Sequence, residues 1–198
     1  MKLETWPQMN QAVPEDQRPT MVWVGRFQPF HNGHASTLRV MMQHFPLNPI
    51  IVAVVSTVGS SAQLPGPGDV RAGREQNPIS AFHRVRMISE YIESLDTQQV
   101  AALALPRPDL FWPLASDMLP DNRTVCVTVG RNDEQGYEAQ KASDFETRGE
   151  TVVRIQVESQ GYASGTKIRQ MAQNRRPTSS LMPAAISAYL DRHGLLGR

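Results

Sequence analysis

The chain has 198 residues, enough for one domain with a substantial core and too few for two large domains. Apolar residues make up 40% of the chain and charged residues 20%, which is typical of a soluble globular protein and argues against disorder. The 20 basic residues nearly balance the 19 acidic ones, so no overall charge favours binding to nucleic acid or to a membrane surface, and any phosphate must be bound locally.

The N-terminal residues and the single cysteine set the expected compartment. Residues 1–19 mix proline, charge and glutamine without periodicity, which predicts an arm that stays mobile or lies across the surface of a single domain over residues 20–198. They contain no apolar core like that of a signal peptide, and no stretch approaches the length of a membrane span. Cys126 lies in an alternating apolar run, where a buried side chain is expected. We therefore expect a cytoplasmic protein without a disulfide.

Short apolar runs alternate with amphipathic stretches along the chain. We expect β-strands at residues 20–24, 50–55, 100–105, 124–129 and 151–157, and helices at 35–45, 80–95 and 110–119, with two more beginning near 164 and 183. The nearly unbroken β-branched run at 50–55 is typical of a strand covered on both faces. These features predict an α/β fold, Rossmann-like, with a parallel sheet of about five strands and helices on both faces. The polar stretch at 133–150 carries no pattern that assigns its structure.

The first candidate site is the turn at residues 25–34, between the first strand and the first helix. A helix N-terminus presents unpaired N–H groups and the positive end of the peptide dipole, which favours a phosphate. His31 and His34 are three residues apart, so both rings lie on one side of the turn and add cationic or hydrogen-bonding groups. Metal binding and a structural role are the alternatives. The other histidines are scattered and no cysteine cluster accompanies them, so we favour phosphate and predict no metal site.

The second candidate site, at residues 164–169, follows the last strand and begins another helix. Ser164 is a suitable N-cap, Gly165 and Thr166 offer backbone N–H groups, and Arg169 adds positive charge. Two phosphate-binding turns at the carboxyl edge of one parallel sheet suggest a nucleoside triphosphate. The chain contains neither a P-loop nor a Gly-x-Gly-x-x-Gly sequence, so P-loop enzymes and ordinary dinucleotide oxidoreductases are not indicated.

Arg84 lies in the first turn of the helix that follows Ser80. A positive charge there opposes the helix dipole, and an anion in front of it would explain its position. A solvated surface arginine is an equal alternative, because the dipole effect is well under about 1 kcal/mol.

Three stretches carry a family resemblance. Residues 25–34 (Gly-Arg-Phe-Gln-Pro-Phe-His-Asn-Gly-His) resemble the His-x-Gly-His signature of the nucleotidylyltransferase superfamily, in the extended form of archaeal-type nicotinamide mononucleotide adenylyltransferases. Residues 164–169 are similar to the second signature of that superfamily, Ile-Ser-Ser/Gly-Thr-x-x-Arg, although Ala163 stands where Ile is usual. Residues 77–84 are similar to the Asn-Pro-Phe-Thr-Ala-Gly-Glu-Arg stretch of the same subfamily, with Ile79 in place of the aromatic residue and His83 in place of Glu.

The resemblance implies adenylyl transfer from ATP to nicotinamide mononucleotide, giving NAD and pyrophosphate, with Mg²⁺ carried on the triphosphate and a homo-oligomeric assembly. It implies catalytic roles for His31, His34 and Arg169. It implies ATP or phosphate contacts for Gly25, Arg26, Phe27, Gly33, Gly130, Ser164, Gly165 and Thr166, and acceptor contacts for Asn77, Arg84, Trp112 and Asn132. For Trp112 a role in the core is an equal alternative. Two other functions stay open: transfer to another acceptor, such as phosphopantetheine or an alcohol phosphate, and a non-catalytic sensor of NAD or ATP.

Overall fold

The structure is a computed structural model that describes residues 14–56, 77–130, 137–157 and 164–196. Five parallel strands form one sheet in the order β3-β2-β1-β4-β5. The strands are β1 (Thr20–Gly25), β2 (Ile50–Val55), β3 (Val100–Leu105), β4 (Arg123–Gly130) and β5 (Val152–Val157). All five lie where the apolar runs of the sequence predict them, so the predicted α/β fold with a Rossmann-like parallel sheet is confirmed.

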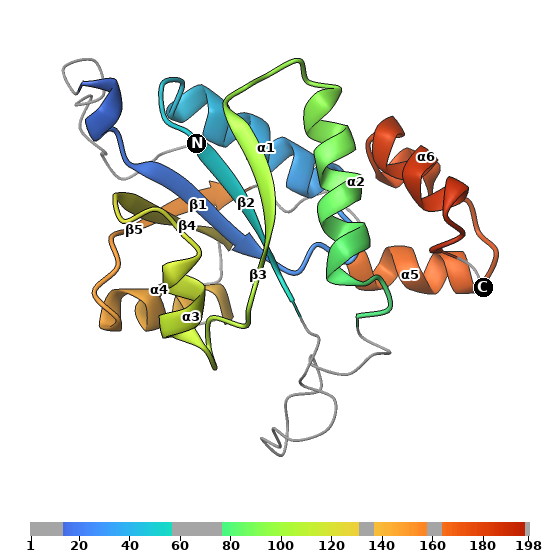
Figure 1. Cartoon of the computed structure of the whole chain (residues 1–198). Coiled ribbons are helices and arrows are strands. Elements are labelled where there is room, and N and C mark those ends of the chain that lie inside the picture. The colour runs from blue at the N-terminus through green and yellow to red at the C-terminus, as the bar shows by residue number, and fades with distance from the viewer. Residues whose placement is uncertain (1–13, 57–76, 131–136, 158–163, 197–198) are drawn as a thin grey trace.

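Helices cover both faces of this sheet (Figure 1). They are α1 (Asn32–His44), α2 (Ala81–Glu93), α3 (Trp112–Asp117), α4 (Tyr137–Thr147), α5 (Gly165–Gln173) and α6 (Ala184–Arg192), with single 3₁₀ turns at η2 (Glu15–Gln17) and η3 (Ser179–Leu181). In the described part of the chain, none of the helices combines the length and apolarity that crossing a bilayer requires.

The core consists of two apolar clusters, one on each face of the sheet. The larger cluster joins buried side chains of α1, α2, α5 and α6 to the strands, for example Leu38, Ile88 and Ile168, all of them fully buried. The smaller one joins α3 and α4 to the other face, through Ala115 and Phe145. Cys126 is fully buried, as expected, and burial raises the pKa of its thiol.

Two helices differ from the sequence-based expectation. Helix α1 begins at Asn32, three residues before the predicted start, because the polar residues ahead of Ala35 already form its first turn. Helix α4 falls in the polar stretch that carries no recognisable pattern. Its only fully buried side chains among the residues described are Ala142 and Phe145, which is too few to reveal a helical period in the sequence.

Residues 14–19 lie against the amino ends of the strands. The Asn122 side-chain amide donates to the Gln17 carbonyl at 2.8 Å, and the Asn48 amide donates to the Pro19 carbonyl, also at 2.8 Å. Residues 1–13 lie outside the described part, so the predicted arm and the single-domain boundary at residue 20 stay predictions.

The order of the strands positions the site. Successive strands run outward from β1 in one direction to β3 and in the other to β5, so the crossover connections diverge at the carboxyl ends of β1 and β4. In open parallel sheets, ligands bind at this point.

Candidate functional site

A cavity of about 880 Å³ lies at the carboxyl ends of the strands. The ends of β1, β2 and β4 form part of its lining, and four further segments complete it: the turn at residues 25–34, the connection from β3 to α3, helix α4 with Arg148 just beyond it, and the N-terminus of α5. The two turns that the sequence predicts as phosphate sites therefore lie beside one cavity.

The two histidines of the first turn are stacked. Their ring centroids are 3.7 Å apart and their planes differ by 25°. The backbone N–H of His31 donates to Nδ1 of His34 at 3.2 Å. Because Nδ1 of the neutral ring then acts as the acceptor, the proton of His34 is assigned to Nε2, which can donate to a ligand.

Burial keeps both rings neutral. It lowers the pKa of His31 to about 4, and burial together with the neighbouring His31 lowers the pKa of His34 well below 6.5. Of the two roles expected from the sequence, cationic and hydrogen-bonding, the free protein therefore presents the second at neutral pH. A bound phosphate would favour the charged form of either ring.

Three aromatic side chains pack against the ring of His34. The rings of Trp23, Phe27 and Phe30 have centroids 5.8, 5.0 and 5.3 Å from that of His34. Phe27, predicted to contact ATP, has a side chain only 3% exposed that packs in this cluster, with a backbone φ of 50°. A Cβ on Gly25 would come within 2.6 Å of the Phe27 ring, which explains the glycine at that position. Gly25 and Phe27 thus shape the turn through packing and backbone conformation.

The N-terminus of α5 is docked onto the same turn. Ser164 caps the helix as predicted, accepting from the Lys167 N–H at 3.2 Å. A Cβ on Gly165 would lie 2.5 Å from the Gln28 carbonyl oxygen, so only glycine allows this approach. Arg169 donates from Nη1 to the same Gln28 oxygen and from Nη2 to Thr166 Oγ1 at 3.3 Å. The two predicted phosphate turns therefore form one unit.

Gln28, which sequence reasoning did not single out, joins this unit to the segment before α2. Its side-chain amide donates to the Ile79 carbonyl at 2.8 Å and accepts from the Ile79 N–H at 3.2 Å. Asn77, predicted to contact the acceptor, lies in the same segment two residues before Ile79. It is buried and is not among the cavity-lining residues. Arg26 lines the cavity, whereas Gly33 lies in the first turn of α1, where its carbonyl accepts from Thr37 Oγ1.

Arg84 is fully buried, so the interpretation as a solvated surface arginine is wrong. Its guanidinium donates to three backbone carbonyls, those of Ile79 (2.9 Å), Arg26 (2.6 Å) and Val55 (2.9 Å). Burial, with a smaller contribution from Arg26, lowers its pKa to about 10, so it remains cationic at neutral pH. It lies behind the cavity wall and holds together the ends of β1, β2 and the segment before α2.

Trp112 also lies away from the cavity lining. It packs edge-on against Phe145, with ring centroids 5.3 Å apart, and the guanidinium groups of Arg123 and Arg148 lie 5.6 and 5.9 Å from its ring centroid. This arrangement favours the core role over stacking on a substrate. Gly130 ends β4, where it pairs with Val157, and Asn132 falls outside the described residues.

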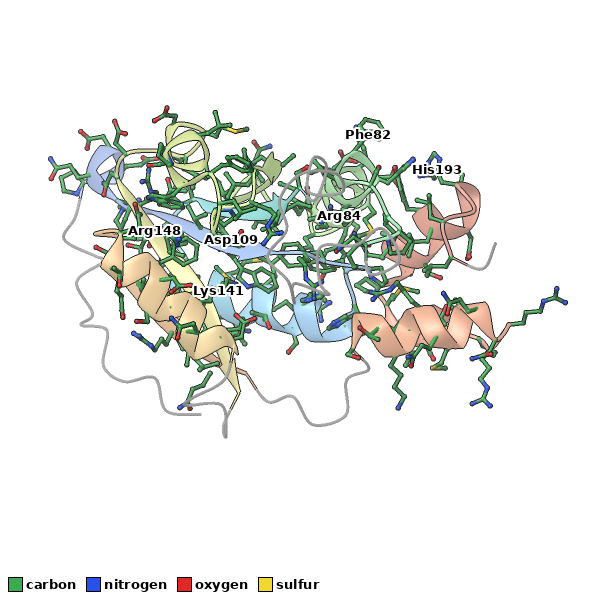
Figure 2. The ribbon with its side chains drawn as sticks, turned by 90° about the horizontal axis from the view of Figure 1, so that it is seen from below. Phe82, Arg84, Asp109, Lys141, Arg148 and His193 are labelled. Carbon is green, nitrogen blue, oxygen red and sulfur yellow. The ribbon has the colours of Figure 1, made fainter. Side chains whose placement is uncertain are left out.

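Sequence reasoning missed the wall of the cavity formed by α4 and by the connection after β3. Arg107, Asp109, Glu138, Lys141, Asp144 and Arg148 contribute its charged groups. Figure 2 shows Lys141 and Arg148 near Asp109, well apart from Phe82 and His193 at the α2 and α6 end of the molecule. The spacing of Glu138, Lys141, Asp144 and Arg148 is helical, which is the signal that the sequence does contain.

Comparisons with known proteins agree with this geometry. A family model described as cytidylyltransferase-like matches residues 22–171, which include both phosphate turns. The nicotinamide-nucleotide adenylyltransferase of Thermococcus kodakarensis is 22% identical over 174 residues, covering 85% of this chain and 80% of that protein.

Among solved structures, the fold is similar to that of a bifunctional NMN adenylyltransferase/ADP ribose pyrophosphatase from Francisella tularensis. The TM-score is 0.57 at 16% identity, over 88% of this chain. The chain spans only 50% of the length of that protein, so the likeness concerns the fold of one part of it.

Proposed function

We propose that this chain, which belongs to the cytidylyltransferase-like family, transfers the adenylyl group of ATP to nicotinamide mononucleotide and releases pyrophosphate. The observation that carries the proposal is the union of the two phosphate turns. The stacked histidines of the first turn and the N-terminus of α5 with Arg169 lie beside one cavity, joined through Gln28. The name of the Thermococcus relative supports the choice of acceptor.

The reaction needs positioning and charge stabilisation more than covalent catalysis. An oxygen of the acceptor phosphate attacks the α-phosphorus of ATP, a new P–O bond forms, and the bond to pyrophosphate breaks. In our proposal the Nε2–H of His34, with His31 beside it, donates to the oxygens of the α-phosphate as negative charge develops on them. Arg169 and the backbone N–H groups at the start of α5 bind the β- and γ-phosphates that leave.

The binding of ATP in this pose requires one exchange of partners. Arg169 already donates to the Gln28 carbonyl and to Thr166, so its guanidinium is preoriented toward the turn but partly engaged. Burial also lowers the pKa of Arg169, and polyphosphate oxygens would stabilise its charged form better than a neutral carbonyl does.

We propose that Mg²⁺ binds together with the triphosphate. Mg²⁺ is usually held by substrate phosphates with one or two carboxylates, not by an all-protein cage. Two carboxylates of the cavity lining fit that pattern: Asp109, which is paired with Arg107, and Asp144, which accepts from the Gln140 side-chain amide at 2.8 Å. Bound there, the ion would neutralise phosphate charge.

The test is an acceptor panel. ATP or CTP is offered with nicotinamide mononucleotide, nicotinate mononucleotide, phosphopantetheine and an alcohol phosphate, with and without Mg²⁺, and pyrophosphate release is measured. We expect release with ATP and nicotinamide mononucleotide. Release only with a different acceptor would move the assignment to that acceptor. Binding of ATP without turnover of any acceptor would favour a sensor. Light scattering on the same sample tests the expected homo-oligomer.

A further inference from the structure

The cavity opens where β1 and β4 separate. The two strands pair from Thr20 and Arg123 as far as Trp23 and Cys126, whereas β4 continues to Gly130 in its pairing with β5. We call the gap beyond Trp23 and Cys126 the fork. At the fork β1 still pairs with β2, as far as Gly25 and Val54, but on its other side it no longer pairs with β4.

Lys141 of α4 occupies the fork. Its Nζ donates to the Val24 carbonyl at 2.7 Å, one residue beyond the last β1–β4 pair, and lies 3.3 Å from Glu138 Oε2. The Lys141 side chain is 15% exposed and lines the cavity. The ammonium thus takes the place of a strand donor and brings a positive charge to the carboxyl end of β1, from the face of the sheet that α4 covers, opposite to the face that α1 covers.

The position of the Lys141 ammonium matters because the proposed ligand is negatively charged. The reacting α-phosphate is an anion, and its transition state spreads negative charge over its oxygens. The two histidines that face it are neutral in the free protein because burial lowers the pKa of each. Arg84 is buried behind the cavity wall, bonded to carbonyls. Lys141 adds a fixed positive charge at the end of β1, beside these rings, to the charges of Arg26 and Arg169 in the same lining.

An ammonium has three N–H donors, and two directions are used by Val24 and Glu138. The third leaves Lys141 able to donate to a substrate oxygen without releasing its hold on β1. Glu138 is itself partly exposed in the cavity lining, with 29% of its side chain accessible.

We propose that Lys141 is a further substrate-binding residue, which contacts a phosphate oxygen of the nucleotide from the fork, opposite His34. This inference rests on the proposed function, since it assumes a nucleotide whose phosphates lie over the end of β1. Glu138 acts against it electrostatically, because its carboxylate competes with the phosphate for the same ammonium. Lys141 and Glu138 therefore have opposite effects on the affinity for phosphate.

The experiment measures ligand binding by calorimetry on the full chain, with ATP and Mg²⁺, with inorganic pyrophosphate, and with adenosine as an uncharged control. Lys141→Met removes the ammonium and keeps the apolar stem. Lys141→Gln removes the charge and keeps an N–H donor for Val24, so one of the two variants stays interpretable if the other folds poorly. We expect ATP and pyrophosphate to bind about 10- to 100-fold more weakly, the effect of losing one charge-assisted hydrogen bond, with adenosine unchanged.

Glu138→Gln should change the affinity for phosphate ligands in the opposite direction. Removing the competing carboxylate should tighten ATP and pyrophosphate binding a few fold. The matched control is Glu146→Gln on the same helix, because Glu146 pairs with Arg154 at 2.7 Å on an exposed surface outside the cavity lining. That variant should bind all three ligands like the wild type.

The outcomes separate the inference from the function on which it rests. If both Lys141 variants bind ATP within about threefold of the wild type, or if adenosine weakens as much as ATP, Lys141 only maintains the shape of the cavity and the inference is wrong. If the wild type binds ATP but does not turn over nicotinamide mononucleotide, the acceptor is wrong and the inference about Lys141 stands. If the wild type does not bind ATP or pyrophosphate at all, the proposed function itself is wrong.

Discussion

The turn at residues 25–34 and helix α4 line the same cavity, but they differ in how they are packed and in the side chains that they present to it. The turn is held by buried aromatic rings, a glycine that clears the Phe27 ring and a buried arginine, and it presents neutral imidazoles. The cavity face of α4 presents charged side chains that are partly exposed. The helix packs on the sheet through Ala142 and Phe145, Lys141 contacts Val24, and Glu146 pairs with Arg154 of β5. The turn thus supplies preorganised hydrogen-bond donors and one charged side chain, that of Arg26, whereas α4 supplies mostly charged side chains.

The largest effect on turnover is expected for His34→Ala, which removes a hydrogen-bond donor of the turn. Loss of one donor that acts in the transition state should lower kcat by about 10²- to 10³-fold, because such donors contribute most where charge develops. Pyrophosphate release measures it. The control is His44→Ala at the exposed end of the same helix, which should leave kcat unchanged. An equal loss in both variants would mean that α1 stability, and not the donor, limits turnover.

Arg169→Ala tests whether α5 belongs with the turn as one triphosphate site. We expect ATP to bind about 10- to 100-fold more weakly while nicotinamide mononucleotide binds nearly as before, since a charge-assisted contact to the leaving phosphates is lost. Calorimetry with each ligand separates the two effects. Arg176→Ala, just beyond the exposed end of α5, is the matched control. Equal weakening of both ligands would contradict the proposed division of roles.

The neutrality of the histidines predicts a pH dependence of stability. The folded-state pKa of His31 is about 4 and that of His34 is also lowered from 6.5, so between these values the unfolded chain binds more protons than the folded one. The free energy of unfolding should therefore fall as the pH drops from about 7 toward 4, by an amount on the order of 1–3 kcal/mol. Urea denaturation at several pH values measures this slope. His31→Asn should flatten it, and a slope equal to that of the wild type in this variant would show that the His31 ring is not the source.

The smallest effect is expected for Trp112, which belongs to the α3 and α4 side of the core. Trp112→Leu should lower stability by about 1 kcal/mol through lost packing and leave the KM for nicotinamide mononucleotide within about twofold. Phe111→Leu, at a neighbouring side chain that is 46% exposed, is the control. A KM that rises tenfold or more for Trp112→Leu alone would restore the substrate-stacking role.

The sequence predicts the turn well and α4 poorly, for physical reasons. Strands such as the run at 50–55 are apolar on both faces, and Ser164 caps α5 where the sequence predicts a helix start, so both features can be predicted from one sequence. The approach of Gly165 to Gln28 could not be predicted in this way, because it joins two distant segments. The part of α4 that lines the cavity is polar, and a polar helical face looks the same whether it meets water or a substrate. The burial of Arg84 was not predictable either, because its partners are backbone carbonyls of distant segments, which leave no pattern in the sequence.

Adenylyl transfer is tested most directly by labelling the phosphates of ATP and finding the label in the products. ATP labelled at the α-phosphate and ATP labelled at the γ-phosphate are each incubated with the protein, Mg²⁺ and nicotinamide mononucleotide, and the products are separated. We expect the α label to appear in NAD and the γ label in pyrophosphate, in equal amounts. Release of the γ label as free phosphate, or an α label that stays in ATP, would contradict it.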